Sequence, residues 1–91
     1  MTTIDVACRP DGEGWSCRVT LADERGSAEH VVRTVPADLD RLAPGATTPD
    51  DLVRRSFEFL LDREPKEAIL RTFDLTVIGR YFPDYEGSIR P

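Results

Sequence analysis

Residues 3–21 decide the fold, and they read TIDVACRPDGEGWSCRVTL. The segments 3–9 and 15–21 each alternate apolar and polar side chains, a period of two that is typical of a strand with one buried face. The Pro, Asp and Gly cluster at 10–14 predicts a turn between them. The stretch therefore predicts an antiparallel β-hairpin, with strands at about 3–9 and 15–22.

A second turn at 23–27 leads into a third predicted strand at 28–35. Its β-branched residues favour a strand but do not choose the buried face. Two alternating sets compete for that face: Ala28, His30, Val32 and Thr34, or Val31 and Val35. With either choice, we expect a three-stranded antiparallel meander.

The second half of the chain predicts helices. A short helical turn is expected at 37–42, with Leu39 and Leu42 toward the core. Thr48 and Pro49 are typical of the N-cap and first position of a helix, which we expect over 49–62. Its apolar side chains cover an arc of roughly 200°, which is wider than one sheet face requires. We therefore expect this helix to be sandwiched between the sheet and a second layer.

Two short C-terminal helices are expected to supply that layer. The first is predicted over 66–73, and the second over 75–82, ended by Pro83. The polar residues 84–91 are predicted to form a mobile tail.

Length and composition fit one acidic α+β domain. The chain has 91 residues, enough for one domain over 1–91, with the sheet at 3–35 and the helical half at 48–82. The formal net charge is −5 without a block of Lys or Arg, which argues against nucleic-acid binding through phosphate contacts. The basic residues are eleven Arg and one Lys, a bias that suggests a bacterial origin.

Two observations favour a cytoplasmic protein. No apolar run approaches the ~20 residues that span a bilayer, so no membrane partner is expected. The first residues, MTTIDVACRPD, have neither the basic nor the apolar region of a signal peptide. Cys8 and Cys17 lie opposite each other if the hairpin turns between Gly12 and Glu13. A disulfide is then one interpretation, but the expected compartment favours two reduced core cysteines.

The sequence predicts no catalytic, cofactor-binding or metal-ligating residue. His30 is the single histidine, and a general base needs both an orienting group and access to substrate. A structural zinc needs four ligands, which one His and two Cys do not supply. The four serines lie outside the known nucleophile motifs. We expect a non-enzyme without cofactors, and keep a small enzyme that uses His30 as an alternative.

An aromatic string at 81–85, YFPDY, is the candidate partner-binding feature. Tyrosine is enriched in protein interfaces, although Phe82 could equally pin the helix end to the core. The candidate partner-binding residues are Tyr81, Phe82, Tyr85, Phe59 and Arg80. The partner is expected to be another protein or a second copy, since a homodimer would cover the wide apolar arc wherever the C-terminal helices leave it open.

Two resemblances bear on function. Residues 54–85, RRSFEFLLDREPKEAILRTFDLTVIGRYFPDY, resemble a segment of short bacterial proteins of unknown function, which implies no activity. The stretch 42–47, LAPGAT, followed by a helix from Pro49, is similar to the Pro-Gly turn and helix of HicB-like antitoxins, which place a strand after that helix. We expect a non-catalytic interaction or regulatory module. The alternative that this resemblance implies is an antitoxin-like regulator that binds a toxin or nucleic acid.

Overall fold

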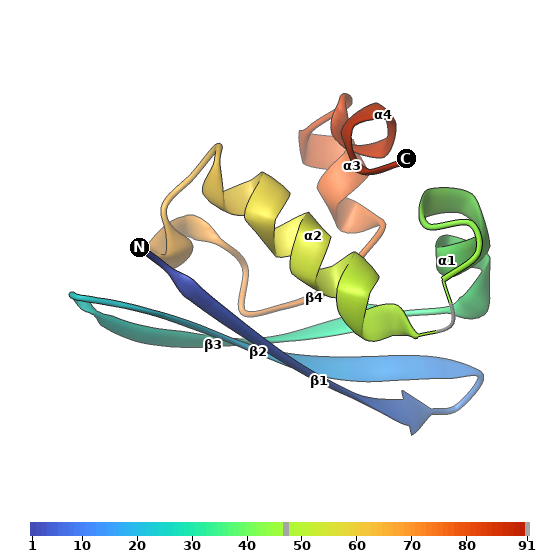
Figure 1. Cartoon of the computed structure of the whole chain (residues 1–91), viewed down its shortest axis with the longest axis horizontal. Helices are drawn as coiled ribbons and strands as arrows, with labels where there is room; N and C mark the ends of the chain where they lie inside the picture. Colours follow the sequence, from blue (N-terminus) through green and yellow to red (C-terminus); the bar gives the residue numbers. More distant parts are fainter. Residues whose placement is uncertain (47, 91) are drawn as a thin grey trace.

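The computed structural model describes residues 1–46 and 48–90, and it confirms an α+β architecture. In this part of the chain one sheet, of order β1-β2-β3-β4, contains β1 (Thr3–Asp11), β2 (Gly14–Asp23), β3 (Gly26–Thr34) and β4 (Thr72–Asp74). One face of the sheet is covered by the helices α1 (Pro36–Leu42), α2 (Pro49–Leu61), α3 (Val77–Tyr81) and α4 (Tyr85–Ile89) (Figure 1). Positions 47 and 91, which fall within the segments 42–47 and 84–91 above, lie outside the described residues.

The first hairpin has the predicted register. Gly12 has a φ of 62° at the first central position of the two-residue turn, a conformation that glycine adopts without steric cost. Cys8 therefore lies opposite Cys17. Cys17, Val19 and Leu21 are fully buried, which confirms the predicted inward face of β2.

The third strand takes the first of its two alternatives, because His30, Val32 and Thr34 are buried. Asp38 joins β3 to α1: its Oδ2 accepts hydrogen bonds from the Thr34 hydroxyl at 2.9 Å and from the Val35 backbone N–H at 3.0 Å. Leu39 and Leu42, on α1, lie in the core as expected.

Helix α2 lies between two layers, as its wide apolar arc predicted. Phe57 is fully buried and packs near Phe73 of β4, with ring centroids 6.0 Å apart. Phe59 lies on another side of the helix, and its ring is 5.2 Å from that of Tyr85 of α4. Thr48 occupies the N-cap, but its side chain makes no capping hydrogen bond, so the helix start depends on Pro49 and on burial.

The helix predicted over 66–73 is wrong. The structure has a 3₁₀ turn, η1 (Lys66–Ala68), followed by β4, which runs parallel to β3. The Val31 N–H donates to the Arg71 carbonyl at 2.7 Å, and the Leu75 N–H donates to the Arg33 carbonyl at 2.9 Å. The free edge of β3 thus supplies hydrogen bonds that outweigh local helix propensity.

The last two helices also differ from expectation. Helix α3 is shorter than the predicted 75–82. Residues 85–89 of the predicted mobile tail instead form α4, in which Tyr85 and Ile89 are only 2% and 4% exposed. These residues are four apart, so they share one face of the helix and pack on the core together.

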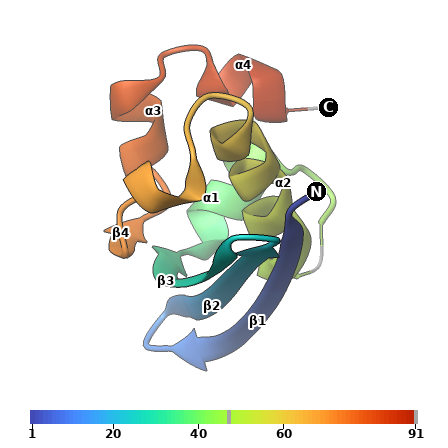
Figure 2. The same cartoon turned by 90° about the vertical axis from the view of Figure 1, so that its left-hand side faces the viewer.

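The single lysine fixes the segment between α2 and β4. Lys66 is buried, and its Nζ donates to both carboxylate oxygens of Asp23 at 3.0 and 2.9 Å and to Glu67 at 2.7 Å. Hydrogen bonds to Glu67 and Asp23 raise the pKa of Lys66, and the bond to Lys66 lowers the pKa of Asp23. This contact ties η1 to the β2–β3 turn, and the segment lies on the β3 side of the sheet (Figure 2).

Candidate functional site

The five candidate partner-binding residues divide between surface and core. Tyr81 is 68% exposed, Arg80 is exposed, and Phe82 is half-buried. Phe59 and Tyr85 are only 6% and 2% exposed, so neither reaches a partner in this conformation. Within the aromatic string, Tyr81 is thus available at the surface, whereas Tyr85 anchors α4 in the core.

The anchor is a polar and aromatic cluster between α2 and α4. The Ser56 and Tyr85 hydroxyls lie 2.6 Å apart, and the Ser56 hydroxyl also donates to the Leu52 carbonyl at 2.8 Å. The Phe59 ring meets the Tyr85 ring edge-on, and the Arg63 guanidinium lies 3.6 Å from the Phe59 ring centroid. These contacts hold α4 against α2. The exposed candidate residues, Arg80 and Tyr81, lie on α3.

Burial makes Tyr85 a source of alkaline instability. Desolvation is the main cause that raises the pKa of Tyr85 from 10.0 to about 12. The protonated Tyr85 phenol contributes fully to the free energy of unfolding below pH 10. This contribution is lost as the pH rises toward 12, because the phenol ionises at a lower pH in the unfolded chain than in the folded one. We expect a loss of about 2 kcal/mol in the free energy of unfolding between pH 9 and 11.5. Urea unfolding across this range measures it.

Tyr85→Phe is the matched control, because it keeps the ring and removes the ionisable hydroxyl. Its stability should fall less than that of the wild type above pH 10. Equal losses in the two proteins would show that other groups cause the alkaline instability.

Beside this anchor lies an apolar hollow of about 240 Å³. It lies between the end of α2, the η1 segment, β4 and α3, all of which border the same side of the molecule (Figure 2). It is lined by Leu60, Glu64, Ala68, Ile69, Leu70, Phe73, Val77, Ile78, Tyr81 and Phe82. We call this feature the Leu70–Tyr81 groove. Glu64 is the one lining residue that is charged at neutral pH.

Two of the lining side chains are unusually exposed for their size. Leu70 is 51% exposed and Tyr81 is 68% exposed. Leu70 follows Ile69, which is 5% exposed, so the chain buries one of two adjacent apolar residues and presents the other. Tyr81 and Phe82 were expected from the sequence, whereas Leu70 and Glu64 were missed. The adjacent Ile-Leu pair was the available signal, because an extended segment cannot turn both side chains inward.

His30 lies in the core rather than at the surface. Its side chain is 2% exposed, and Nδ1 donates to the Leu70 carbonyl, 2.7 Å away. The ring centroid lies 5.5 Å from that of Phe57. Among the described residues, the buried Nε2 has no hydrogen-bond partner. The side chain holds the Leu70 backbone, and its burial argues against the alternative of an enzyme that uses His30.

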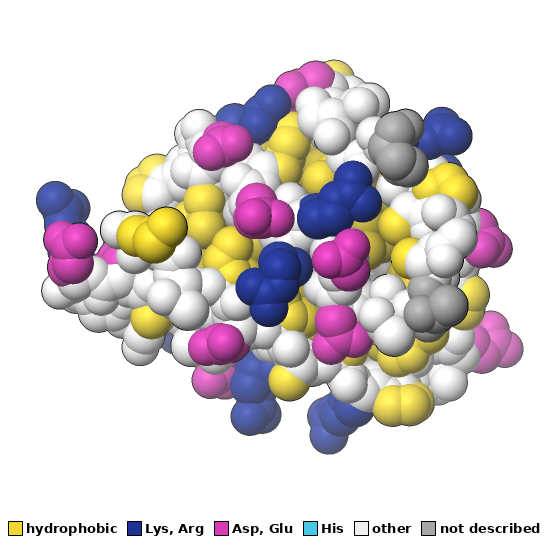
Figure 3. All heavy atoms as spheres, viewed as in Figure 1, with side chains coloured by type: hydrophobic (Ala, Val, Ile, Leu, Met, Phe, Trp, Pro, Cys, Tyr) yellow, Lys and Arg dark blue, Asp and Glu magenta, His cyan; other side chains and the backbone are white. Residues whose placement is uncertain are grey.

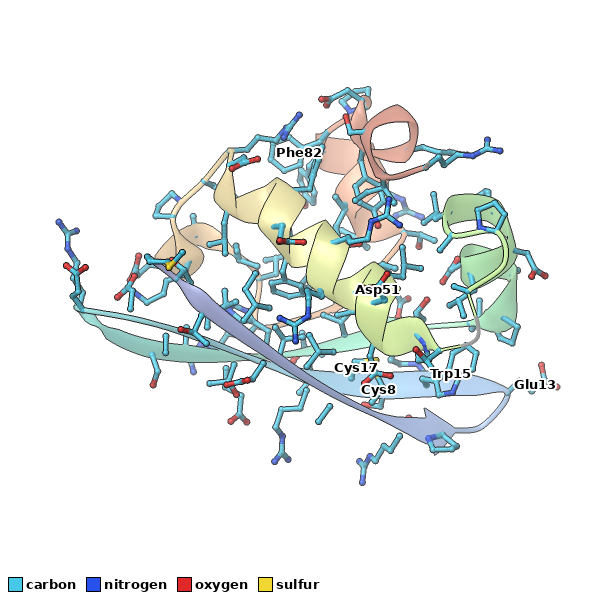
Figure 4. All side chains as sticks on the ribbon, viewed as in Figure 1. Cys8, Glu13, Trp15, Cys17, Asp51 and Phe82 are labelled. Atoms are coloured by element: carbon cyan, nitrogen blue, oxygen red, sulfur yellow. A yellow bond between two sulfur atoms is a disulfide. The ribbon has the colours of Figure 1, made fainter. Side chains whose placement is uncertain are left out.

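The structure corrects the expectation of two reduced cysteines, because Cys8 and Cys17 form a disulfide across β1 and β2. Their Cα atoms are 4.0 Å apart, and the pair lies beneath the start of α2, near Trp15 (Figure 4). The register of the hairpin brings the two side chains together on one face. The bridge ties the edge strand to the centre of the sheet.

The described residues form no evident metal site, and the face that includes α2 has no basic patch (Figure 3). Within residues 1–46 and 48–90, no three His, Cys, Asp or Glu side chains are grouped as metal ligands. On the face that includes α2, positive and negative side chains are mixed and no histidine is visible (Figure 3). Of the helices the structure describes, none is long and apolar enough to cross a membrane.

Comparisons with known proteins add no relative. No protein-family model, no curated protein and no solved structure matches the chain. The functional proposal therefore depends on the geometry of the chain alone.

Proposed function

We propose that the chain is a non-catalytic bacterial protein-interaction module, and that the Leu70–Tyr81 groove receives an apolar side chain of a partner protein. The observation that carries the proposal is the exposure of Leu70 and Tyr81, 51% and 68%, beside an apolar hollow. Exposed apolar side chains around a concavity are typical of protein interfaces.

The lining suggests the chemistry of the partner. A bulky apolar anchor fits a groove walled by Phe73, Ile78 and Phe82. Glu64 borders the same groove, and none of the ion pairs among the described residues includes it. The partner segment would therefore carry a Lys or Arg close to its anchor, where it can pair with Glu64.

Hydrogen bonds hold two of the segments that line the groove. The Leu70 backbone is held by His30, and the η1 segment is held by Lys66 through Asp23. A site fixed in this way loses little conformational entropy when a partner binds.

One observation favours an antitoxin-like regulator as a more specific form of the proposal. Strand β4 follows α2, which agrees with the strand after the helix in HicB-like antitoxins. A toxin would then be the protein that occupies the groove. Nucleic acid is the less favoured partner, because the net charge is −5 and the face around α2 mixes both signs (Figure 3).

A displayed-peptide selection tests the groove. We expect the wild-type protein to enrich peptides with one bulky apolar residue near a Lys or Arg. Leu70→Asp should weaken their binding by about tenfold to a hundredfold, because burial of such a side chain contributes about 1.5–3 kcal/mol. The dissociation constants of synthetic copies of the peptides, measured by fluorescence anisotropy, check this result.

Ala37→Asp is the matched control, since it introduces the same charge at an exposed position of α1, a helix that does not line the groove. It should leave the dissociation constants unchanged. Thermal unfolding must show that both variants fold. Peptides that bind the Leu70→Asp variant as tightly as the wild type, or a selection without enrichment, would contradict the proposal.

A further inference from the structure

The second surface of interest is the free edge of β1. This strand has nine residues and lies at the end of the sheet order β1-β2-β3-β4, so one of its edges is unpaired among the described residues. An unpaired edge presents backbone N–H and C=O groups that can pair with another strand. The opposite edge of the sheet, β4, has only three residues.

The register tells which groups of β1 face outward. A two-residue turn is closed by a hydrogen-bonded pair, here Asp11 and Gly14, so the odd-numbered residues of β1 bond to β2. Cys8 and Cys17 are then a non-hydrogen-bonded pair. Their Cα separation of 4.0 Å agrees, since such pairs lie at roughly 4.5 Å and hydrogen-bonded pairs at roughly 5.5 Å.

A side-chain contact supports this assignment independently. The carbonyl of Ile4, an even-numbered residue, accepts a hydrogen bond from Arg54 Nη1 at 2.6 Å, as expected of a group at the free edge. The backbone groups of Val6 and Cys8 face the same free edge. Their side chains are half-buried and pack at the margin of the core, so a strand added here would cover them further.

We propose that β1 pairs antiparallel with β1 of a second copy of the chain, with Ala7 at the twofold axis. In this register Val6 lies opposite Cys8, and their outward backbone groups exchange hydrogen bonds on both sides of the axis. Asp5 of each copy lies opposite Arg9 of the other, on the exposed face of the sheet.

Charge favours this register over those centred on residues 5, 6, 8 and 9. Pairing centred on Asp5 or on Arg9 places identical charges opposite each other, and pairing centred on Cys8 places Asp5 opposite Asp11. Pairing centred on Val6 leaves Asp5 opposite Ala7. Asp5 and Arg9 are absent from the ion pairs formed among the described residues, so both remain available. Opposite charges in facing positions stabilise a strand pair, and like charges destabilise it.

Pro10 fits the same arrangement. It lies opposite Ile4 of the second copy and lacks an N–H, so it cannot serve the Ile4 carbonyl. That carbonyl already accepts its hydrogen bond from Arg54. The Pro10 carbonyl, in contrast, can accept from the Ile4 N–H. The Ile4 carbonyl, which receives no hydrogen bond from Pro10 of the second copy, is therefore the carbonyl that Arg54 of its own chain already satisfies.

This dimer names the partner of a second surface. It rests on the proposed function only in that both treat the chain as a protein-interaction module. The groove adjoins β4, whereas the proposed contact is at β1, on the opposite edge of the sheet. A dimer would carry two open grooves, which raises the avidity for a partner with two anchors.

Sedimentation velocity over a concentration series tests the contact. We expect the wild type to dimerise reversibly. Asp5→Arg and Arg9→Asp should each weaken dimerisation by about tenfold to thirtyfold, because two attractive pairs become repulsive. A mixture of the two single variants should restore dimers, since each arginine then faces an aspartate. The doubly substituted chain, Asp5→Arg with Arg9→Asp, should also dimerise.

Ser27→Arg is the control for an added charge away from the β1 edge, and it should leave the dimer unchanged. Thermal unfolding establishes that each variant folds. A wild type that stays monomeric to millimolar concentration, or a dimer insensitive to either charge reversal, would overturn the proposal. A dimer that is lost with Leu70→Asp instead would place self-association in the groove. Peptide binding that persists in the monomeric variants would retain the groove proposal by itself.

Discussion

Phe57→Ala is expected to lower the free energy of unfolding by about 3–5 kcal/mol. Phe57 is fully buried in α2 and packs between His30 of β3 and Phe73 of β4, with ring centroids 5.5 and 6.0 Å away. The change removes apolar surface from the core and leaves a cavity that rigid neighbours on both strands cannot fill. Urea unfolding followed by circular dichroism measures the loss.

Glu58→Ala is the matched control, because the next residue of α2 is exposed. Its effect should stay within about 0.5 kcal/mol. A loss below about 1.5 kcal/mol for Phe57→Ala would show that β4 and the η1 segment collapse onto the cavity. The groove would then also change shape, and peptide binding would be lost together with stability.

Reduction of the Cys8–Cys17 disulfide is expected to destabilise the fold by about 2–3 kcal/mol. The bridge closes a loop with a sequence separation of 9, and a crosslink of this length removes a moderate amount of chain entropy from the unfolded state. In a domain of this size, the loss corresponds to a fall in melting temperature of about 10–20 °C. Thermal unfolding with and without a phosphine reductant measures it.

The double variant Cys8→Ala with Cys17→Ala should melt at the same temperature with and without reductant. Two free thiols in the unreduced protein, counted with a thiol reagent after denaturation, would contradict the disulfide. In that case the reductant should leave the wild-type melting temperature unchanged as well.

The meander and the long helix were predictable because their signals are local. Alternation over 3–9 and 15–21, with a glycine-containing turn between them, is enough to pair Cys8 with Cys17 across the hairpin. The apolar arc of α2 likewise predicted two covering layers. Neither signal identifies which strand or helix covers the apolar face, because periodicity shows that a face is apolar and not which segment packs against it.

Strand β4 was not predictable from its own residues. Three residues carry too little periodicity to distinguish a strand from a helical turn. Its state is decided by Val31 and Arg33 of β3, whose backbone groups bond to Arg71 and Leu75, far later in the chain. Strand β4 therefore forms because of long-range pairing with β3.

The candidate site shows the same division. The sequence identified the aromatic string at 81–85, of which Tyr81 lies at the surface. It did not separate Tyr81 from Tyr85, since the separation depends on α4 turning back onto Ser56 of α2.

The sequence by itself determined the acidic α+β character, the register of the first hairpin and the two apolar sides of helix α2, because composition and short periods specify local structure. Only the tertiary structure decided the fourth strand, the burial of His30 and Tyr85, and the groove beside Leu70. Burial and edge pairing join residues that are distant in the chain, and the free energy that decides them comes from those contacts.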